Sequence, residues 1–125
     1  MEWTTERRYR RYEDWSNDEI KQIKEKMAQS PWHTRYHVEP KKGLLNDPNG
    51  FSYFDGKWIL FYQNFPLGAA HGLKSWVQLE SDDLVHFTET GGKVLPDTPL
   101  DSQGDYSGSA MQLGDQLFQF YTGSG

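Results

Sequence analysis

One carboxylate, Asp47, lies within a short stretch rich in residues that bend or stiffen the backbone: Leu44-Leu45-Asn46-Asp47-Pro48-Asn49-Gly50. Pro48 has no backbone N–H to donate and favours an extended conformation for the residue before it, whereas Asn49 and Gly50 readily adopt positive φ. We therefore predict a sharp turn that presents the Asp47 carboxylate rigidly and then leads into a strand. Taken alone, the stretch is more typical of an ordinary Asx-type turn that feeds a hairpin, so the rest of the chain must decide its role.

Two other groups of residues have the types, but not the spacing, of metal ligands. His33 and His37 are four residues apart, as on a zinc-binding helix, but Pro31 and Pro40 bracket them in a segment that is not expected to be helical. Three aspartates recur every four residues rather than at the alternating positions of a calcium loop, and we expect them to be solvated turn residues: Asp97, Asp101 and Asp105. We expect no metal and no cofactor.

The composition limits the class of protein further. The 125 residues suit one domain with a modest core, and the lack of cysteine excludes disulfides and thiolate catalysis within this sequence. The net charge of −5 argues against a nucleic-acid or anionic-membrane binder, which needs an excess of basic residues. The first residues lack the apolar region of a secretory signal and no later run is long enough to cross a bilayer, so we expect a soluble cytoplasmic protein of undetermined oligomeric state.

The elements that must position Asp47 begin with a helical N-terminal extension over residues 1–31. Residues 4–14 mix arginine with aromatic residues, which is more typical of a short helix packed on the domain than of a phosphate or nucleic-acid site. Ser16 and Glu19 form a capping box, which predicts an amphipathic helix from about residue 17 to residue 29.

After Gly50 the hydrophobic pattern changes to the two-residue period of strands. Asp55-Gly56 separates two strand-forming runs and is a strong hairpin signal. We predict four strands in this part of the chain, over residues 51–54, 57–63, 75–81 and 84–88. Residues 91–104 are expected to form a long connection.

The same arrangement then recurs. An Asp-x-polar-Gly segment, a strand, a Gly-Asp hairpin and an aromatic strand follow again, with Gly50 and Gly108 at equivalent positions about 58 residues apart. A four-stranded unit repeating at about this length is typical of a β-propeller blade. We therefore predict an all-β fold in which residues 32–125 form about one and a half blades. Because such a piece leaves strand edges unpaired, we expect the chain to be the first part of a longer protein.

This architecture suggests what Asp47 could bind. The first strand of each blade lines the central channel, so Asp47 would project into the funnel at one end of the channel. Amides, hydroxyls and aromatic rings are expected to surround it, and these groups suit the hydroxyls and apolar faces of a sugar: Asn46, Gln63, Trp76, Tyr106 and Ser107.

Several motifs in order along the chain carry a resemblance to a known family. They are Asn46-Asp47-Pro48-Asn49-Gly50, the preceding His37-Val38-Glu39-Pro40, the aromatic strand Phe61-Tyr62-Gln63, Ser81-Asp82-Asp83-Leu84-Val85-His86-Phe87, Tyr106-Ser107-Gly108-Ser109-Ala110 and Tyr121-Thr122-Gly123. Together they resemble glycoside hydrolase family 32, the β-fructosidases. The N-terminal helix and the segment from His71 to Trp76 particularly resemble the bacterial members that act on sucrose 6-phosphate. The resemblance implies a five-bladed propeller followed by a β-sandwich.

The resemblance also implies a chemistry. Terminal β-D-fructofuranosides would be hydrolysed with retention, Asp47 attacking the anomeric carbon to form a covalent fructosyl-enzyme. The acid/base partner in this family is a glutamate from a later blade, beyond Gly125, so we expect this chain alone to be inactive. The residues expected to bind the sugar are Leu44, Leu45, Asn46, Gln63, His71, Trp76, Tyr106 and Ser107.

Some positions differ from the commoner family pattern, and several readings stay open. Leu44-Leu45 replaces Trp-Met, and His71 stands where many members have tryptophan, so sucrose, sucrose 6-phosphate and fructans are all possible substrates. A neutral loop role is favoured for His71 and Lys74 over a contact with a substrate phosphate. The rival function classes are a non-catalytic carbohydrate-binding propeller and a structural or interaction propeller.

Overall fold

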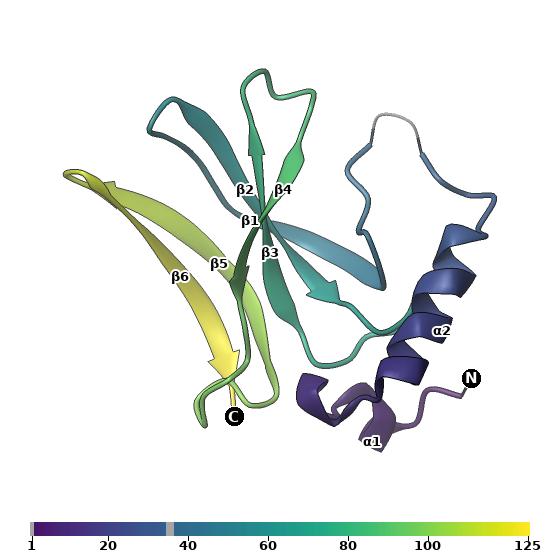
Figure 1. The fold of residues 1–125 in the computed structure, drawn as a ribbon. Coiled ribbons are helices and arrows are strands. Elements are labelled where there is room, and N and C mark those ends of the chain that lie inside the picture. The colour runs from purple at the N-terminus through teal and green to yellow at the C-terminus, as the bar shows by residue number, and fades with distance from the viewer. Residues whose placement is uncertain (1, 35–36) are drawn as a thin grey trace.

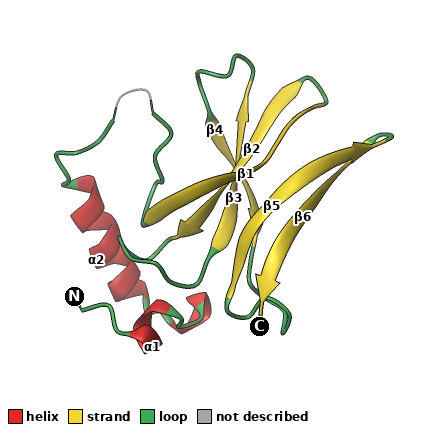
Figure 2. Cartoon of the chain, turned by 180° about the vertical axis from the view of Figure 1, so that it is seen from behind, coloured by secondary structure: helices red, strands yellow, loops and turns green. Residues whose placement is uncertain are grey.

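The computed structural model describes residues 2–34 and 37–125, which form a helical segment, a four-stranded antiparallel sheet and a separate two-stranded sheet. In Figures 1 and 2 the helices lie on one side of the larger sheet and the smaller sheet lies on its other side. The helices are α1 (Thr5–Arg8), the 3-10 helix η1 (Tyr12–Asp14) and α2 (Asn17–Ala28). The strands are β1 (Leu44–Phe54), β2 (Lys57–Phe65), β3 (Ser75–Ser81), β4 (Thr88–Val94), β5 (Gly104–Leu113) and β6 (Gln116–Ser124).

The predicted capping box starts α2. The Ser16 hydroxyl accepts a hydrogen bond from the Glu19 backbone N–H at 3.3 Å, and the Glu19 carboxylate accepts one from the Ser16 backbone N–H at 3.1 Å. The helix ends at Ala28, one residue before the predicted end. Within residues 2–34 and 37–125 no helix is both long and apolar enough to span a bilayer.

The N-terminal segment is anchored to the loop that follows β2. Its apolar side chains share one buried cluster with residues of that loop: Trp15, Ile23, Phe65, Leu67 and Leu73. The backbone of Leu73 is held from both sides, because its N–H donates to Arg8 O at 2.7 Å and its carbonyl accepts from Tyr12 Oη at 2.6 Å. A domain boundary at residue 31 stays a prediction.

The first sheet has the strand order β1-β2-β3-β4, and the hairpin at Asp55-Gly56 is confirmed. The predicted fourth strand over residues 84–88 is wrong, since β4 runs over Thr88–Val94. The segment before β4 forms a turn because Ser81 Oγ accepts from Leu84 N at 2.9 Å and Asp83 Oδ1 accepts from His86 N at 2.8 Å. These side-chain acceptors satisfy backbone groups that a strand would have paired.

The predicted turn around Asp47 is also wrong, because the whole stretch belongs to β1. Pairing with β2 shifts between Leu45 and Pro48, so that Asn46 and Asp47 together lie opposite the single residue Gln63. Such a β-bulge bends a strand, re-aims its side chains and tolerates a proline that has no N–H to donate. The residues that suggested a turn therefore produce an irregular strand instead.

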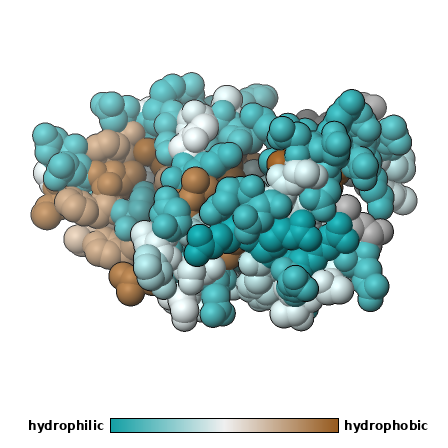
Figure 3. Space-filling model, turned by 60° about the horizontal axis from the view of Figure 1, so that its bottom comes forward, coloured by the Kyte–Doolittle hydropathy of each residue, from teal (hydrophilic) through white to brown (hydrophobic). Residues whose placement is uncertain are grey.

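The strands β5 and β6 form the predicted second hairpin around Gly114-Asp115. Their pairing also shifts, between Tyr106 and Gly108, which leaves Ser107 as the extra residue of a bulge in β5. The four-stranded sheet followed by a hairpin of similar design agrees with the predicted blade and half-blade, while the count of five blades stays a prediction. The hairpin exposes the large apolar side chains of Met111, Leu113, Phe118 and Phe120. Figure 3 shows apolar surface gathered at the end of the molecule where the hairpin lies.

Candidate active site

Asp47 lies at the junction of the two sheets, where three strands each contribute one side chain. Its Oδ2 atom accepts a hydrogen bond from Ser107 Oγ of β5 at 3.3 Å and from Gln63 Nε2 of β2 at 3.5 Å. Gln63 Nε2 also lies 3.3 Å from Ser107 Oγ, so the three polar groups form a closed triangle. Asp47 and Ser107 are exposed whereas Gln63 is buried. The carboxylate is therefore accessible to solvent and hydrogen-bonded to an amide on its buried side.

The bulge at Asn46-Asp47 in β1 and the bulge at Ser107 in β5 bring these side chains together, and Asn49 joins the two strands. Asn49 is buried, its Nδ2 donates to the carbonyl of Asp47 at 3.0 Å, and its Oδ1 accepts from Gly108 N at 2.9 Å. One side chain thus links the bulge of β1 to the bulge of β5. Gly50 follows Asn49 with a backbone φ of +57°, a conformation that residues other than glycine rarely adopt.

Asn46 contacts Lys74, a residue for which the sequence favours a neutral loop role. Its Oδ1 accepts a hydrogen bond from the side-chain ammonium of Lys74. Lys74 is only 2% exposed, and burial lowers its pKa to about 8, partly opposed by the Asp47 carboxylate. The available signal is the position of this lysine between the large apolar residues Leu73 and Trp76, since a lysine buried with such neighbours needs a polar partner.

Three of the residues predicted to touch the sugar have packing partners in the core, and their contact with a sugar stays a prediction. Leu44 packs against the apolar cluster beside α2, and Leu45 packs against a second cluster that includes Tyr62. Trp76 is fully buried, so it is not one of the exposed side chains around Asp47. Its Nε1 donates to the carbonyl of Tyr106 at 3.1 Å, directly before Ser107 in the chain.

Of two further predicted residues, Tyr106 directly precedes Ser107 in β5 and His71 lies in the loop after β2. The Tyr106 ring is partly buried and its hydroxyl donates to Gln103 O at 3.1 Å; burial, with the nearby Tyr9, raises its pKa. His71 is exposed in the loop after β2. Within the described part of the chain no hydrogen bond joins His71 to the triangle of Asp47, Gln63 and Ser107.

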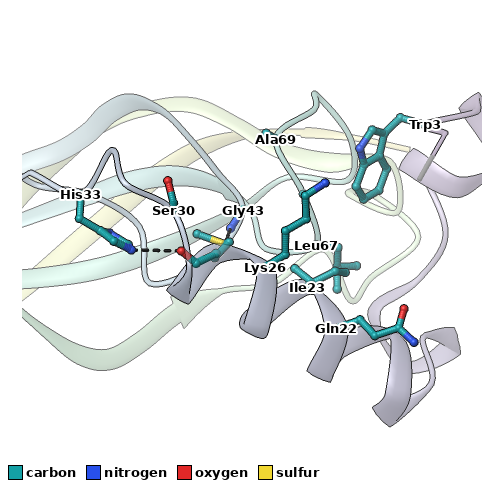
Figure 4. Close-up of a pocket in the computed structure, with 11 residues that line it drawn as sticks. Trp3, Gln22, Ile23, Lys26, Ser30, His33, Gly43, Leu67 and Ala69 are labelled. Carbon is teal, nitrogen blue, oxygen red and sulfur yellow. Dashed lines mark hydrogen bonds between the residues drawn. The ribbon is translucent and has the colours of Figure 1, made fainter.

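A separate cavity of about 560 Å³ lies between α2 and the loop after β2 (Figure 4). None of the described residues that line it carries a carboxylate, so the predicted chemistry is not assigned to this cavity. His33 at its rim has Glu39 Oε1 2.9 Å from Nδ1 and Met27 O 3.1 Å from Nε2. Both partners are hydrogen-bond acceptors, and the contacts with the Glu39 carboxylate and then with the Met27 carbonyl raise the pKa of His33.

Two of the three aspartates expected to be solvated are buried, so that prediction is wrong for Asp101 and Asp105. Asp101 accepts hydrogen bonds from Thr98 N at 2.8 Å and from Tyr121 Oη at 2.9 Å. Asp105 is fully buried, no donor among the described residues hydrogen-bonds its carboxyl oxygens, and burial, reinforced by Asp101 and Asp97, raises its pKa to about 7. Within residues 2–34 and 37–125 no three His, Cys, Asp or Glu side chains are grouped to hold a metal ion.

We expect Asp105→Asn to stabilise the protein at about pH 8 and to have little effect near pH 4. The unfolded carboxyl ionises around its ordinary pKa of 3.8, whereas the folded one does so at about 7. Stability should therefore fall as the pH rises between these values and stay low above them. The uncharged amide removes this dependence, and the gain at about pH 8 should be on the order of 1–3 kcal/mol.

Thermal unfolding of the parent and the variant at several pH values measures this difference. Asp115→Asn, in the exposed turn between β5 and β6, is the matched control and should change little at any pH. A constant offset between parent and Asp105→Asn across the whole range would show that the carboxyl does not titrate in this way.

Comparison with known proteins shows which family the sequence and fold match. The profile of the glycosyl hydrolases family 32 N-terminal domain matches residues 37–125. The chain is 70% identical over 117 residues to sucrose-6-phosphate hydrolase of Streptococcus mutans, covering 94% of this chain and 24% of that protein.

Solved structures agree with the sequence comparison. The structure of sucrose-6-phosphate hydrolase from Lactobacillus gasseri matches with a TM-score of 0.91 and 48% identity, covering 98% of this chain and 25% of that one. A Bombyx mori family 32 β-fructofuranosidase mutant in complex with sucrose matches with a TM-score of 0.68 and 30% identity, covering 87% of this chain and 24% of that one. The chain thus spans about a quarter of the length of the curated relatives it matches.

Proposed function

Because the chain belongs to glycosyl hydrolase family 32, we propose that it supplies the nucleophile and part of the sugar pocket of an enzyme that hydrolyses terminal β-D-fructofuranosides. The observation that carries this proposal is the exposed Asp47 carboxylate, held through Oδ2 by Ser107 and Gln63. A nucleophile must be both accessible and fixed in direction, and this arrangement provides both.

The proposed reaction is a double displacement. Asp47 attacks the anomeric carbon of the fructosyl unit through Oδ1, which accepts no hydrogen bond from any residue that the structure describes, while the two donors hold Oδ2 in place. The glycosidic bond breaks as the leaving oxygen is protonated, and water then hydrolyses the fructosyl ester with overall retention. The acid that protonates the leaving group must lie roughly 5 Å away. Among the described residues no second carboxylate joins the Asp47 cluster, so we assign that role to the part of the enzyme outside this chain.

The substrate that we propose is sucrose 6-phosphate, with sucrose as the weaker alternative. The support is the name of the relatives that match nearly the whole chain, at 70% and 54% identity. Asn46 and Gln63 would hydrogen-bond the fructosyl hydroxyls, and Ser107 would close one wall of the pocket.

The test uses an enzyme of full family length that carries residues 1–125, if necessary by joining them to the remaining three quarters of the Streptococcus mutans relative. We refer to this protein as the family-length enzyme. Its kcat/KM on sucrose 6-phosphate should exceed that on sucrose by about tenfold or more, because a phosphate adds charge-assisted hydrogen bonds that a hydroxyl cannot. Proton NMR of the first product should show the β-anomer of fructose. Equal efficiencies would remove the preference for the phosphorylated sugar, and the α-anomer would contradict the retaining mechanism.

A further inference from the structure

Lys74 is an unusual residue in this site because its charge is almost completely removed from water. Its side chain is 2% exposed, and its ammonium donates to Asn46 Oδ1. Asn46 is next to Asp47 in the bulge of β1, so the buried cation lies beside the proposed nucleophile. Burial of a lysine costs free energy unless the charge is paired or hydrogen-bonded. The hydrogen bond to Asn46 offsets part of this cost, so the Lys74 ammonium and the Asn46 amide depend on each other.

The chemistry of the ammonium fixes the direction of the Asn46 amide. A protonated lysine can only donate hydrogen bonds, whereas an asparagine amide has one accepting end and one donating end. With Oδ1 bonded to Lys74, the Nδ2 group of Asn46 must point elsewhere, and it donates to none of the residues described. Because Asn46 is only partly buried, this donor remains available to a ligand.

The position of Lys74 is itself fixed by two other parts of the chain. The preceding residue, Leu73, is held by Arg8 O and Tyr12 Oη from the N-terminal segment. The carbonyl of Lys74 accepts a hydrogen bond from Asp105 N of β5 at 3.0 Å. The ammonium therefore extends from a backbone that is clamped on both sides, which a directional contact requires.

We propose that Lys74 is a positioning residue, which holds the Asn46 amide so that its N–H donors face the fructosyl unit beside Asp47. This inference rests on the proposed function, and it adds a residue that does not itself touch the sugar. It also assigns the ligand side of the contact: Asn46 donates, so the fructosyl group must offer an oxygen acceptor there.

Double-mutant analysis of the family-length enzyme tests this role. Lys74→Met keeps a long side chain but removes the donor, and should lower kcat/KM on the fructoside by about tenfold to a hundredfold. If Lys74 acts through Asn46, the same change in an Asn46→Ala background should cost less than about twofold. Lys93→Met, an exposed lysine on β4, is the matched control and should leave kcat/KM unchanged.

A second variant keeps the test valid if Lys74→Met does not fold. Asn46→Asp has nearly the shape of asparagine and can still accept from Lys74, so its melting temperature should stay close to that of the parent. It has lost the N–H donors, so its kcat/KM should fall at least as far as that of Asn46→Ala. Full activity of Asn46→Asp would overturn the proposed direction of the amide.

Three outcomes separate this inference from the proposed function. A loss from Lys74→Met that is equally large in the Asn46→Ala background would show that Lys74 acts directly on the substrate or on Asp47. If Lys74→Met keeps the kcat/KM of the parent while Asp47→Asn loses turnover, the positioning role is refuted and the proposed function is not. A folded parent enzyme that hydrolyses no fructoside would refute the proposed function.

Discussion

Asp47→Asn in the family-length enzyme is expected to lower kcat on its fructoside substrate by about four orders of magnitude, with substrate affinity within about tenfold of the parent. Asparagine has nearly the shape of aspartate and can still accept hydrogen bonds from Ser107 and Gln63 through its amide oxygen. A neutral amide cannot form the fructosyl ester, so the chemical step is lost while the pocket is kept.

Steady-state kinetics measure kcat of the variant and the parent. Calorimetry measures the affinity of the variant for the intact fructoside, which it does not hydrolyse. Asp82→Asn, an exposed carboxylate that pairs with Lys57 on the same sheet as Asp47, is the control and should keep its turnover. Retained turnover in Asp47→Asn would refute the nucleophile assignment. A parent that binds fructosides without hydrolysing them would be a carbohydrate-binding propeller, and one that binds no sugar would favour a structural or interaction role.

Trp76→Ala is expected to lower the free energy of unfolding by about 3–5 kcal/mol, the usual range for removing a large buried aromatic side chain. Trp76 is fully buried, and its ring centroid lies 5.5 Å from that of Phe61 and 6.1 Å from that of Tyr121. The variant also leaves the carbonyl of Tyr106 without its donor. Since Tyr106 precedes Ser107, activity should fall together with stability.

Thermal or denaturant unfolding of the family-length enzyme provides the measurement for this variant. Trp32→Ala is the matched control, because Trp32 is 85% exposed and its removal should change stability by less than about 0.5 kcal/mol. Trp76→Phe should lose less stability than Trp76→Ala because it retains most of the ring. Equal melting temperatures for Trp76→Ala and the parent would contradict the buried position of this side chain.

Local sequence signals predicted the features that depend only on neighbouring residues. The capping box of Ser16 and Glu19 and the hairpin at Asp55-Gly56 each rest on contacts within a few residues, and both are present. The predicted fourth strand over residues 84–88 is wrong because Asp83 and Ser81 bind backbone groups locally, a competition that hydrophobic periodicity does not report.

The parts of the site that the sequence did not reveal depend on contacts between distant segments. Asp47 was assigned to a turn, since Pro48 and Gly50 suit a bulge as well as a turn and only pairing with β2 distinguishes the two. Lys74 and Asp105 carry charges that place them on the surface by default. Their burial arises because the N-terminal segment and β5 both cover the backbone that follows Leu73.

The bulge in β1 makes the direction of the Asp47 side chain depend on a count of residues. At this bulge two residues of β1 face one residue of β2, and deleting either Asn46 or Asp47 would remove the bulge and shift the register by one position there. Substitutions of the flanking leucines leave that count unchanged. In a lineage of related sequences, this segment should therefore accept changes of residue type at Leu44 and Leu45 while rejecting every insertion or deletion between Leu45 and Pro48.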